Sequence, residues 1–311
     1  LVMLAYTFFG GFLAVSWSDV LQGTLMFLAL VLVAAMGVAM TGGFGDMAAA
    51  LEARNPALLD PFVGEGGQAI GAMGIVSLLA WGLGYPGQPH ILARFMAIRD
   101  ASEMPTARRV AMGWVVVVLA AAIVVGMAGI LVLDPPLAGT DSEKVFVVMS
   151  ATFLHPVLAG ICMSGILAAI MSTASAQLLV ASSAFAQDFY KGLFRHDPGR
   201  VELLWVGRGT VLVIAALAYA LAFNPDNKVL DLVAWAWAGF GAAFGPAIVL
   251  SLYWRGMTRN GALAGIVVGG LTVILWKQGS GGIFALYEMV PGVVLGTLAI
   301  WITSRFSPPS G

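Results

Sequence analysis

The sequence predicts an all-α membrane protein with several transmembrane helices. Of its 311 residues, 60% are hydrophobic and only 10% are charged, and the mean hydropathy of +0.94 lies far above that of soluble proteins. The apolar residues gather in nine long runs, and the basic residues between these runs alternate between a large and a small group. A net charge of −1 gives no indication of a nucleic-acid partner.

Each apolar run is expected to form one helical crossing, since about 20 apolar residues span the hydrocarbon core of a bilayer. The runs cover residues 1–16, 20–41, 69–97, 110–133, 157–187, 205–223, 229–254, 261–276 and 284–304. Leu1 opens inside the first run with no initiator Met. We therefore expect the first crossing to be cut short and an N-terminal part of the protein to be missing.

Lysine and arginine predict the orientation of these crossings. Eleven of them lie in one set of loops and four in the other, and the two sets alternate along the chain. The positive-inside rule places the larger set, and with it the C-terminus, in the cytoplasm. The larger set is Arg94, Arg99, Arg108, Arg109, Lys191, Arg195, Arg200, Arg208, Arg255, Arg259 and Arg305, and the smaller set is Arg54, Lys144, Lys228 and Lys277.

The same pattern defines the loops of a single transmembrane domain over residues 1–311. Residues 98–109 and 188–204 are expected to be cytoplasmic, and residues 42–68 and 134–156 extracellular. Each extracellular loop is long enough to contain a short surface helix, which we place near residues 46–54 and 143–154. We expect the tail from Ser307 to add no soluble domain.

The stretch from Leu79 to Phe95 interrupts an apolar run. Three glycines and two prolines, at positions 82, 84, 86, 87 and 89, fall within eight residues at its centre. Proline removes a backbone donor and glycine weakens a helix, so we expect the helix to break here. Backbone freed inside a membrane must be buried in protein or line a wet cavity. Because transporters use broken helices to hold substrates and ions, we interpret the break as a binding site rather than a plain proline kink.

The sequence argues against an enzyme. Asp19, Asp46 and most other acids fall in expected loops or at helix ends, so we expect no carboxylate at mid-membrane and expect any bound ion to be held by neutral oxygens. The Gly43-Phe-Gly-Asp46 sequence matches an intramembrane protease pattern, but a second buried aspartate is lacking. The single cysteine, Cys162, excludes a disulfide framework within the chain.

Ala169, Ser172 and Thr173 stand at i, i+3 and i+4 in an apolar run and therefore share one helical face. Two hydroxyls beside a small residue give a cation access to side-chain and backbone oxygens, which suits Na⁺ better than Zn²⁺. The alternative is structural, because Ser and Thr also bond their own helix or join neighbouring helices. His90, directly after the break, and Trp237, in a Gly- and aromatic-rich helix, are candidates for lining or gating a cavity.

Several longer motifs resemble the sodium:solute symporter family, and within it the members that carry proline. They are Trp81-Gly-Leu-Gly-Tyr85-Pro-Gly-Gln-Pro89-His90, Ile166-Leu-Ala-Ala-Ile-Met-Ser172-Thr173, Trp205-Val-Gly-Arg208 and Ala236-Trp-Ala-Gly-Phe-Gly-Ala-Ala-Phe-Gly-Pro246. The resemblance covers essentially the whole chain. It implies a leucine-transporter-like inverted-repeat fold of thirteen helices, of which this chain is roughly the last two-thirds, with about nine helices present.

The resemblance also implies roles for individual residues. Trp81, Tyr85 and Pro89 fall where the family binds proline, and their spacing puts them on one face if the helix persists locally. Ala169, Ser172 and Thr173 fall on the half of the family's sodium site that this helix contributes, and Glu143 falls on an acidic gating position of an external loop. Pro86 departs from the aromatic residue, typically Phe, expected at its position.

The expected function is therefore sodium-coupled import of L-proline by alternating access, in the plasma (inner) membrane, with Na⁺ as coupling ion and no other cofactor. Membrane lipid is the expected surrounding, and no obligate protein partner is evident. Two alternatives stay open at this point. One is a Na⁺ symporter for another small organic solute, and the other is the membrane input domain of a sensor kinase.

Overall fold

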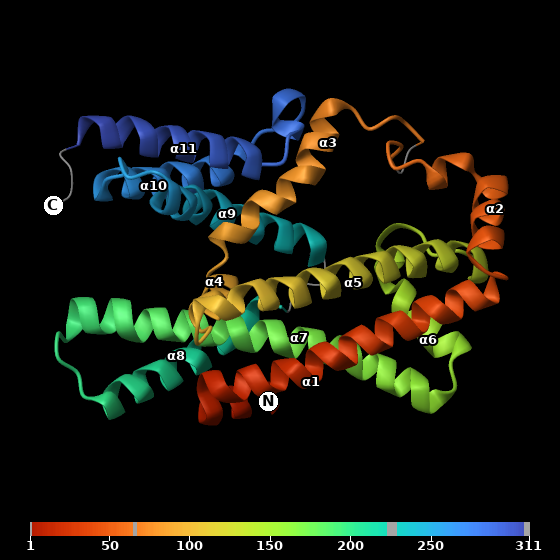
Figure 1. Ribbon diagram of the computed structural model, residues 1–311, viewed down its shortest axis with the longest axis horizontal. Helices are drawn as coiled ribbons and strands as arrows, with labels where there is room; N and C mark the ends of the chain where they lie inside the picture. The colour runs from red at the N-terminus through yellow and green to blue at the C-terminus, as the bar shows by residue number, and fades with distance from the viewer. Residues whose placement is uncertain (1, 65–66, 223–228, 308–311) are drawn as a thin grey trace. The chain divides into compact units, whose positions relative to one another are not determined.

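The computed structural model describes residues 2–64, 67–222 and 229–307 and is almost entirely helical there (Figure 1). Within these residues, seven helices are long and apolar enough to cross a membrane. The chain forms two compact units, Leu1–Pro61 with Ile98–Phe223, and Phe62–Ala97 with Asn224–Gly311. Lys228 and the tail 308–311, which entered the predicted topology, lie outside the described residues.

The first unit is built around one long helix, α1 (Val2–Met40), which packs against α7 (Pro156–Ala184) and α5 (Met104–Val132), with α8 (Arg200–Leu221) against α7. Small residues make the contacts between these helices close. A Cβ on Gly37 would stand 2.6 Å from the Cβ of Ala128. Lipid offers no hydrophobic force that drives helices together, so this close contact between backbones supplies much of the attraction.

Two short helices complete the first unit, and both agree with the sequence analysis. They are α2 (Phe44–Arg54) and α6 (Val145–Phe153), each within two residues of its predicted range. Both helices are anchored in the unit and do not lie on its surface alone, because Leu51 of α2 and Met149 of α6 are fully buried in the same core as Val33 of α1.

The start of the chain differs from the prediction. The runs 1–16 and 20–41 were expected to be two crossings separated by a cytoplasmic turn. They belong to one helix, α1, whose single interruption is Gly11 with φ 55° and ψ −147°. Only glycine adopts this backbone conformation without strain. The interruption therefore lies at Gly11 and not at residues 17–19, between the two predicted runs.

Helices also extend into the predicted cytoplasmic loops. The helix α5 begins at Met104, with Pro105 in its first turn, where a missing N–H costs nothing. The helix α7 continues as a π-helical segment, η5 (Phe185–Phe194), so residues 195–199 alone connect it to α8.

The second unit combines the interrupted segment with three long helices, α9 (Val229–Tyr253), α10 (Arg259–Trp276) and α11 (Met289–Phe306). A stripe of small residues joins α10 to its neighbours, because Gly261, Gly265 and Gly269 are all buried. A Cβ on Gly265 would overlap Ile300 of α11, and one on Gly269 would overlap the carbonyl oxygen of Ala242 in α9. This stripe lets three backbones approach closely.

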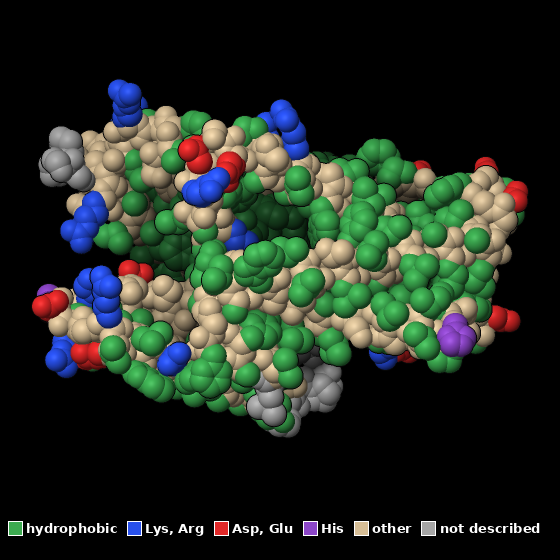
Figure 2. All heavy atoms as spheres, turned by 60° about the horizontal axis from the view of Figure 1, so that its bottom comes forward, with side chains coloured by type: hydrophobic (Ala, Val, Ile, Leu, Met, Phe, Trp, Pro, Cys, Tyr) green, Lys and Arg blue, Asp and Glu red, His purple; other side chains and the backbone are tan. Residues whose placement is uncertain are grey.

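Hydrophobic side chains cover most of the face shown in Figure 2. Large apolar residues on the long helices stay exposed, including Leu21, Val213, Leu252 and Leu275. Patches of this extent are rare on soluble proteins. They agree with helices that face lipid.

Candidate functional site

The predicted break in the apolar run 69–97 is confirmed. The segment begins as α3 (Ala72–Leu79), tightens into a 3₁₀ segment, η2 (Ala80–Gly87), and restarts as α4 (Pro89–Met96). Gln88 between them is extended, with φ −88° and ψ 110°. Pro89 opens α4 at a position where its missing N–H needs no partner. The restart therefore follows directly from the proline.

Two glycines of η2 let α9 approach this break. A Cβ on Gly84 would overlap the indole nitrogen of Trp237, and a Cβ on Gly87 would overlap the carbonyl oxygen of Phe240. Gly241 of α9 meets the same segment, since its Cβ would lie 2.7 Å from the Cα of Gly84. No other residue type fits at these contacts. The glycines that weaken the helix therefore also let it pack against α9.

An aromatic cluster lies at the break. The rings of Trp81 and Trp237 stack with centroids 5.3 Å apart, and Trp81 is also nearly parallel to Tyr287 at 6.5 Å. Tyr85 meets Trp237 edge to face at 4.9 Å. The indole N–H of Trp237 donates to the carbonyl oxygen of Trp81 at 3.0 Å, and the hydroxyl of Tyr287 donates to the carbonyl oxygen of Ala234 at 2.7 Å. Hydrogen bonds thus fix both rings that flank Trp81.

The buried side-chain amide of Gln88 links the two segments that carry this cluster. Gln88 is 3% exposed, and its side-chain amide donates to the carbonyl oxygens of Gly84 and Trp237, at 3.3 and 3.2 Å. The Gly84 carbonyl lies in the last turn of the 3₁₀ segment, where regular helical donors run out, whereas the Trp237 carbonyl belongs to α9. Sequence analysis missed Gln88 and Tyr287. An amide inside an apolar run, flanked by Gly and Pro, was the available signal for Gln88.

The predicted proline-site residues are only partly brought together. Trp81, Tyr85 and Trp237 belong to the cluster, and Tyr85 remains 49% exposed. Helicity does not persist across the break, so Pro89 does not share a helical face with Trp81. Pro89 and His90 lie in the first turn of α4, outside the ring contacts described here.

The predicted sodium-site residues lie in the first unit, on α7. The hydroxyl of Ser172 donates to a carboxylate oxygen of Asp19 on α1 at 2.5 Å, and the buried Ser175 donates to the carbonyl oxygen of Ser172 at 3.0 Å. Ala169 is half-buried one turn earlier, and Thr173 is exposed. A carboxylate, a hydroxyl and a carbonyl oxygen are hard ligands of the kind that alkali cations prefer.

The expectation that acids lie only in loops and at helix ends is wrong for Asp19. This residue lies well inside α1, half-buried, and it lines a cavity of about 320 Å³ with Gly23, Thr24 and Trp114 among others. The signal in the sequence was the lack of glycine or proline around Asp19, which argued against a turn there. The predicted ion-site oxygens on α7 thus include Ser172, which is hydrogen-bonded to a carboxylate rather than to neutral oxygens alone.

Glu143, the predicted gating residue, is exposed in a 3₁₀ segment, η4 (Gly139–Lys144). The neighbouring Lys144 forms an ion pair with Asp141 at 2.7 Å, and this hydrogen-bonded carboxylate raises the pKa of Lys144. The gating role of Glu143 stays a prediction.

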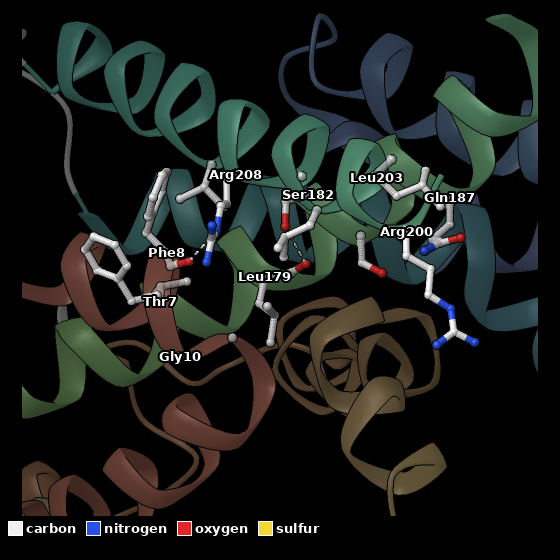
Figure 3. A pocket seen from close by; sticks show the side chains of 16 residues that line it. Thr7, Phe8, Gly10, Leu179, Ser182, Gln187, Arg200, Leu203 and Arg208 are labelled. Carbon is white, nitrogen blue, oxygen red and sulfur yellow. Dashed lines mark hydrogen bonds between the residues drawn. The ribbon is translucent and has the colours of Figure 1, made fainter. Parts of the chain in front are cut away.

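A second cavity of the first unit, of about 470 Å³, lies between the start of α1, the end of α7 and α8 (Figure 3). The guanidinium of Arg208 reaches into it beside Phe8 and donates to the carbonyl oxygen of Phe8 at 3.0 Å. The same group lies 5.0 Å from the ring centroid of Phe8 and 5.1 Å from that of Trp205. Arg208 thereby ties α8 to the segment that precedes the break at Gly11.

Comparison with known proteins identifies the family. The model of the sodium:solute symporter family matches residues 1–269. The chain belongs to this family. It is 48% identical over 306 residues to the sodium/proline symporter of Escherichia coli (strain K12), covering 97% of this chain and 60% of the relative. It is 45% identical over 304 residues to a high-affinity proline transporter of Bacillus subtilis (strain 168), covering 97% and 63%.

The fold of this sodium:solute symporter chain resembles a solved structure, the substrate-bound, outward-open state of a Na⁺-coupled sialic acid symporter. The TM-score is 0.77 at 20% identity, over 99% of this chain and 66% of the other. The predicted leucine-transporter-like, all-helical fold class is thereby confirmed. The chain spans about 60% of the length of the curated relatives it matches. Because the family consists of symporters, the prediction of a transporter rather than an enzyme is also confirmed.

Proposed function

We propose that the complete protein imports L-proline together with Na⁺ by alternating access. The observation that carries this proposal is the 45–48% identity to relatives named as sodium/proline symporters and proline transporters over 97% of the chain. The geometry of the two candidate sites supports it. We further propose that the protein lies in the plasma (inner) membrane with the C-terminus in the cytoplasm, as the eleven-to-four division of basic residues favours.

The aromatic cluster supplies a surface for the substrate. A pyrrolidine ring packs well against aromatic faces and edges, and its ammonium group is attracted to the electron-rich faces of indole and phenol rings. Tyr85 is the more exposed ring, and Trp81 is held in place by Trp237 and Tyr287. We therefore assign Tyr85 and Trp81 to substrate binding, and Trp237 to fixing Trp81. Pro89 ends the break and sets where α4 restarts.

The oxygens around Ser172 supply the ion site. Asp19 offers a negative charge that offsets the charge of Na⁺, and the hydroxyls of Ser172 and Thr173 with the backbone at Ala169 offer neutral oxygens. The Ser172 hydroxyl donates to Asp19. Bound Na⁺ would coordinate the oxygen atoms of Ser172 and Asp19 that form this hydrogen bond. Ion binding and the hydrogen bond therefore compete.

The membrane potential is sufficient to drive the transport. One charge moving through 100 mV releases about 2.3 kcal/mol, which supports about a fiftyfold concentration ratio of a neutral zwitterion such as proline. Ion binding raises the population of the outward-open state only insofar as Na⁺ binds that state more tightly. Coupling thus requires an ion site whose geometry differs between the two states.

The decisive experiment measures uptake of labelled L-proline into proteoliposomes that contain the complete protein, with and without an inward Na⁺ gradient. We expect accumulation with the gradient, none without it, and competition by proline analogues alone. Uptake of a different solute with the same Na⁺ dependence would contradict the assignment to proline, and Pro86, half-buried inside η2, would be the first residue to exchange for Phe. A protein that binds both ligands without transporting them would contradict symport and favour a sensor.

A further inference from the structure

An apolar groove runs along the second unit between the end of α9 and the second half of α11. It has a volume of about 510 Å³ and is lined by Leu250, Trp254, Thr297, Leu298 and Trp301. No function assigned above uses these residues. The groove lies entirely within the second unit, so its shape follows from the packing of α9 on α11.

Arginines gather at one end of this groove. The guanidinium of Arg305 lies 4.4 Å from the ring centroid of Trp301, and Arg255 directly follows Trp254. Both arginines are exposed, as is Arg259 at the start of α10. In the sequence from 232 to 311, Glu288 is the only acid, and it pairs with Lys277 at 3.9 Å at the opposite end of α10 and α11. Arg255 and Arg305 therefore give this end of the groove a positive charge.

The two tryptophans give the groove a fixed shape. The ring of Trp254 packs against Gly256, where a Cβ would come within 2.8 Å of it, and Trp301 carries Arg305 on its ring. Tryptophan and arginine together are typical of the interface between hydrocarbon and headgroups. The apolar lining next to them continues over exposed Leu298 toward the bilayer interior.

We propose that this groove binds one phospholipid with an anionic headgroup. An acyl chain lies along Leu250 and Leu298, and the phosphodiester is held by Arg255 and Arg305. Charge complementarity selects an anionic headgroup, since each basic residue near a membrane surface favours anionic lipid. The apolar walls select a lipid over free phosphate, which gains nothing from them. In the proposed orientation, on which this assignment rests, this end of the second unit lies in the inner leaflet.

Native mass spectrometry of the complete protein in detergent tests the proposal, with phosphatidylglycerol and phosphatidylcholine of identical acyl chains as probes. We expect the wild type to retain one phosphatidylglycerol at least tenfold more strongly than phosphatidylcholine. The double variant Arg255→Gln/Arg305→Gln is expected to lose on the order of tenfold of this preference. The matched control Arg108→Gln/Arg109→Gln removes two exposed arginines from the first unit and is expected to keep it.

A second variant distinguishes lipid binding in the groove from a general effect of surface charge. Thr297→Phe fills the groove while leaving every arginine in place, so we expect it to lower retention of phosphatidylglycerol. Equal retention of both lipids by the wild type overturns the proposal. So does full retention by Thr297→Phe, or an equal loss in the two double variants. Proline uptake measured on each variant shows that the protein is folded and is not expected to report lipid binding.

Discussion

Trp237 both stacks on Trp81 and donates its indole N–H to the carbonyl oxygen of the same residue, at 3.0 Å. One side chain of α9 thus holds the ring and the backbone of the broken segment. The Trp81 carbonyl lies in a 3₁₀ segment, whose own hydrogen bonds have poorer geometry, and it gains a donor that the membrane interior would not supply.

Trp237→Phe is the direct test of this contact. Phe retains a ring for stacking but removes the hydrogen bond, which contributes about 1 kcal/mol net. We expect the proline concentration for half-maximal uptake to rise about fivefold, with the Na⁺ dependence unchanged. Trp205→Phe is the control, because it makes the same change in the first unit, outside the aromatic cluster at the break. An equal effect of both variants on proline affinity would speak for a general loss of stability.

Three glycines of η2 allow a test of close packing within one segment. Gly84→Ala and Gly87→Ala place a methyl group into Trp237 and into the backbone of α9, whereas a Cβ on Gly82 meets nothing within 4 Å. Overpacking costs roughly 1–3 kcal/mol. We expect the first two variants to lower the thermal unfolding midpoint in detergent and to impair proline uptake, and Gly82→Ala to leave both near wild type. A Gly84→Ala protein with wild-type affinity and stability would disprove the contact.

The sequence was most informative where a rule is local. Apolar length predicted the positions of the long helices, and Pro86 with Pro89 predicted the break, because proline acts on its own backbone wherever it stands. The short helices α2 and α6 followed from the length of their loops. These features need no knowledge of the rest of the fold.

Such local rules do not identify contacts between residues that are far apart in the sequence. Trp81 and Trp237 are 156 residues apart, and Ser172 lies 153 residues from Asp19. Asp19 was misplaced because Ser16-Trp-Ser-Asp19 looked polar enough for a turn, although a half-buried acid can stay in a helix once another helix supplies a donor. Gly11 was not singled out, because a glycine in an apolar run is equally typical of close helix packing.

The bond between Ser172 and Asp19 predicts how Na⁺ dependence responds to mutation. Asp19→Asn keeps the shape but removes the charge, and charge-assisted contacts are worth about 1.5–3 kcal/mol. We expect the Na⁺ concentration for half-maximal proline uptake to rise tenfold or more in Asp19→Asn, and by a smaller factor in Ser172→Ala. The measurement is initial uptake rate against external Na⁺ at saturating proline.

Ser164→Ala is the control for this series. Its hydroxyl lies on the same helix and donates only to the carbonyl oxygen of Gly160, four residues earlier. We expect its Na⁺ dependence to be that of the wild type. If Asp19→Asn and Ser172→Ala also keep wild-type Na⁺ dependence, the pair is a structural contact between α1 and α7, and Thr173 becomes the next residue to examine.

We expect Arg208 to keep residues 2–10, the segment before Gly11, well ordered. Its guanidinium donates to the carbonyl oxygen of Phe8 and lies over the rings of Phe8 and Trp205 (Figure 3). Lysine keeps the charge but has neither the Nε donor nor the planar group that stacks on rings. We expect Arg208→Lys to lower the stability by about 1–2 kcal/mol and to speed hydrogen exchange of backbone amides in residues 2–10.

Arg200→Lys provides the comparison in the same cavity. Arg200 is exposed and, in Figure 3, extends away from the Phe8 contact. Because it does not hold the segment, exchange in residues 2–10 is expected to stay at the wild-type rate. Faster exchange in Arg208→Lys alone assigns the order of this segment to one guanidinium. Equal exchange rates in the wild type, Arg208→Lys and Arg200→Lys would instead assign the order of this segment to the burial of Thr7, which is 3% exposed on the same turn.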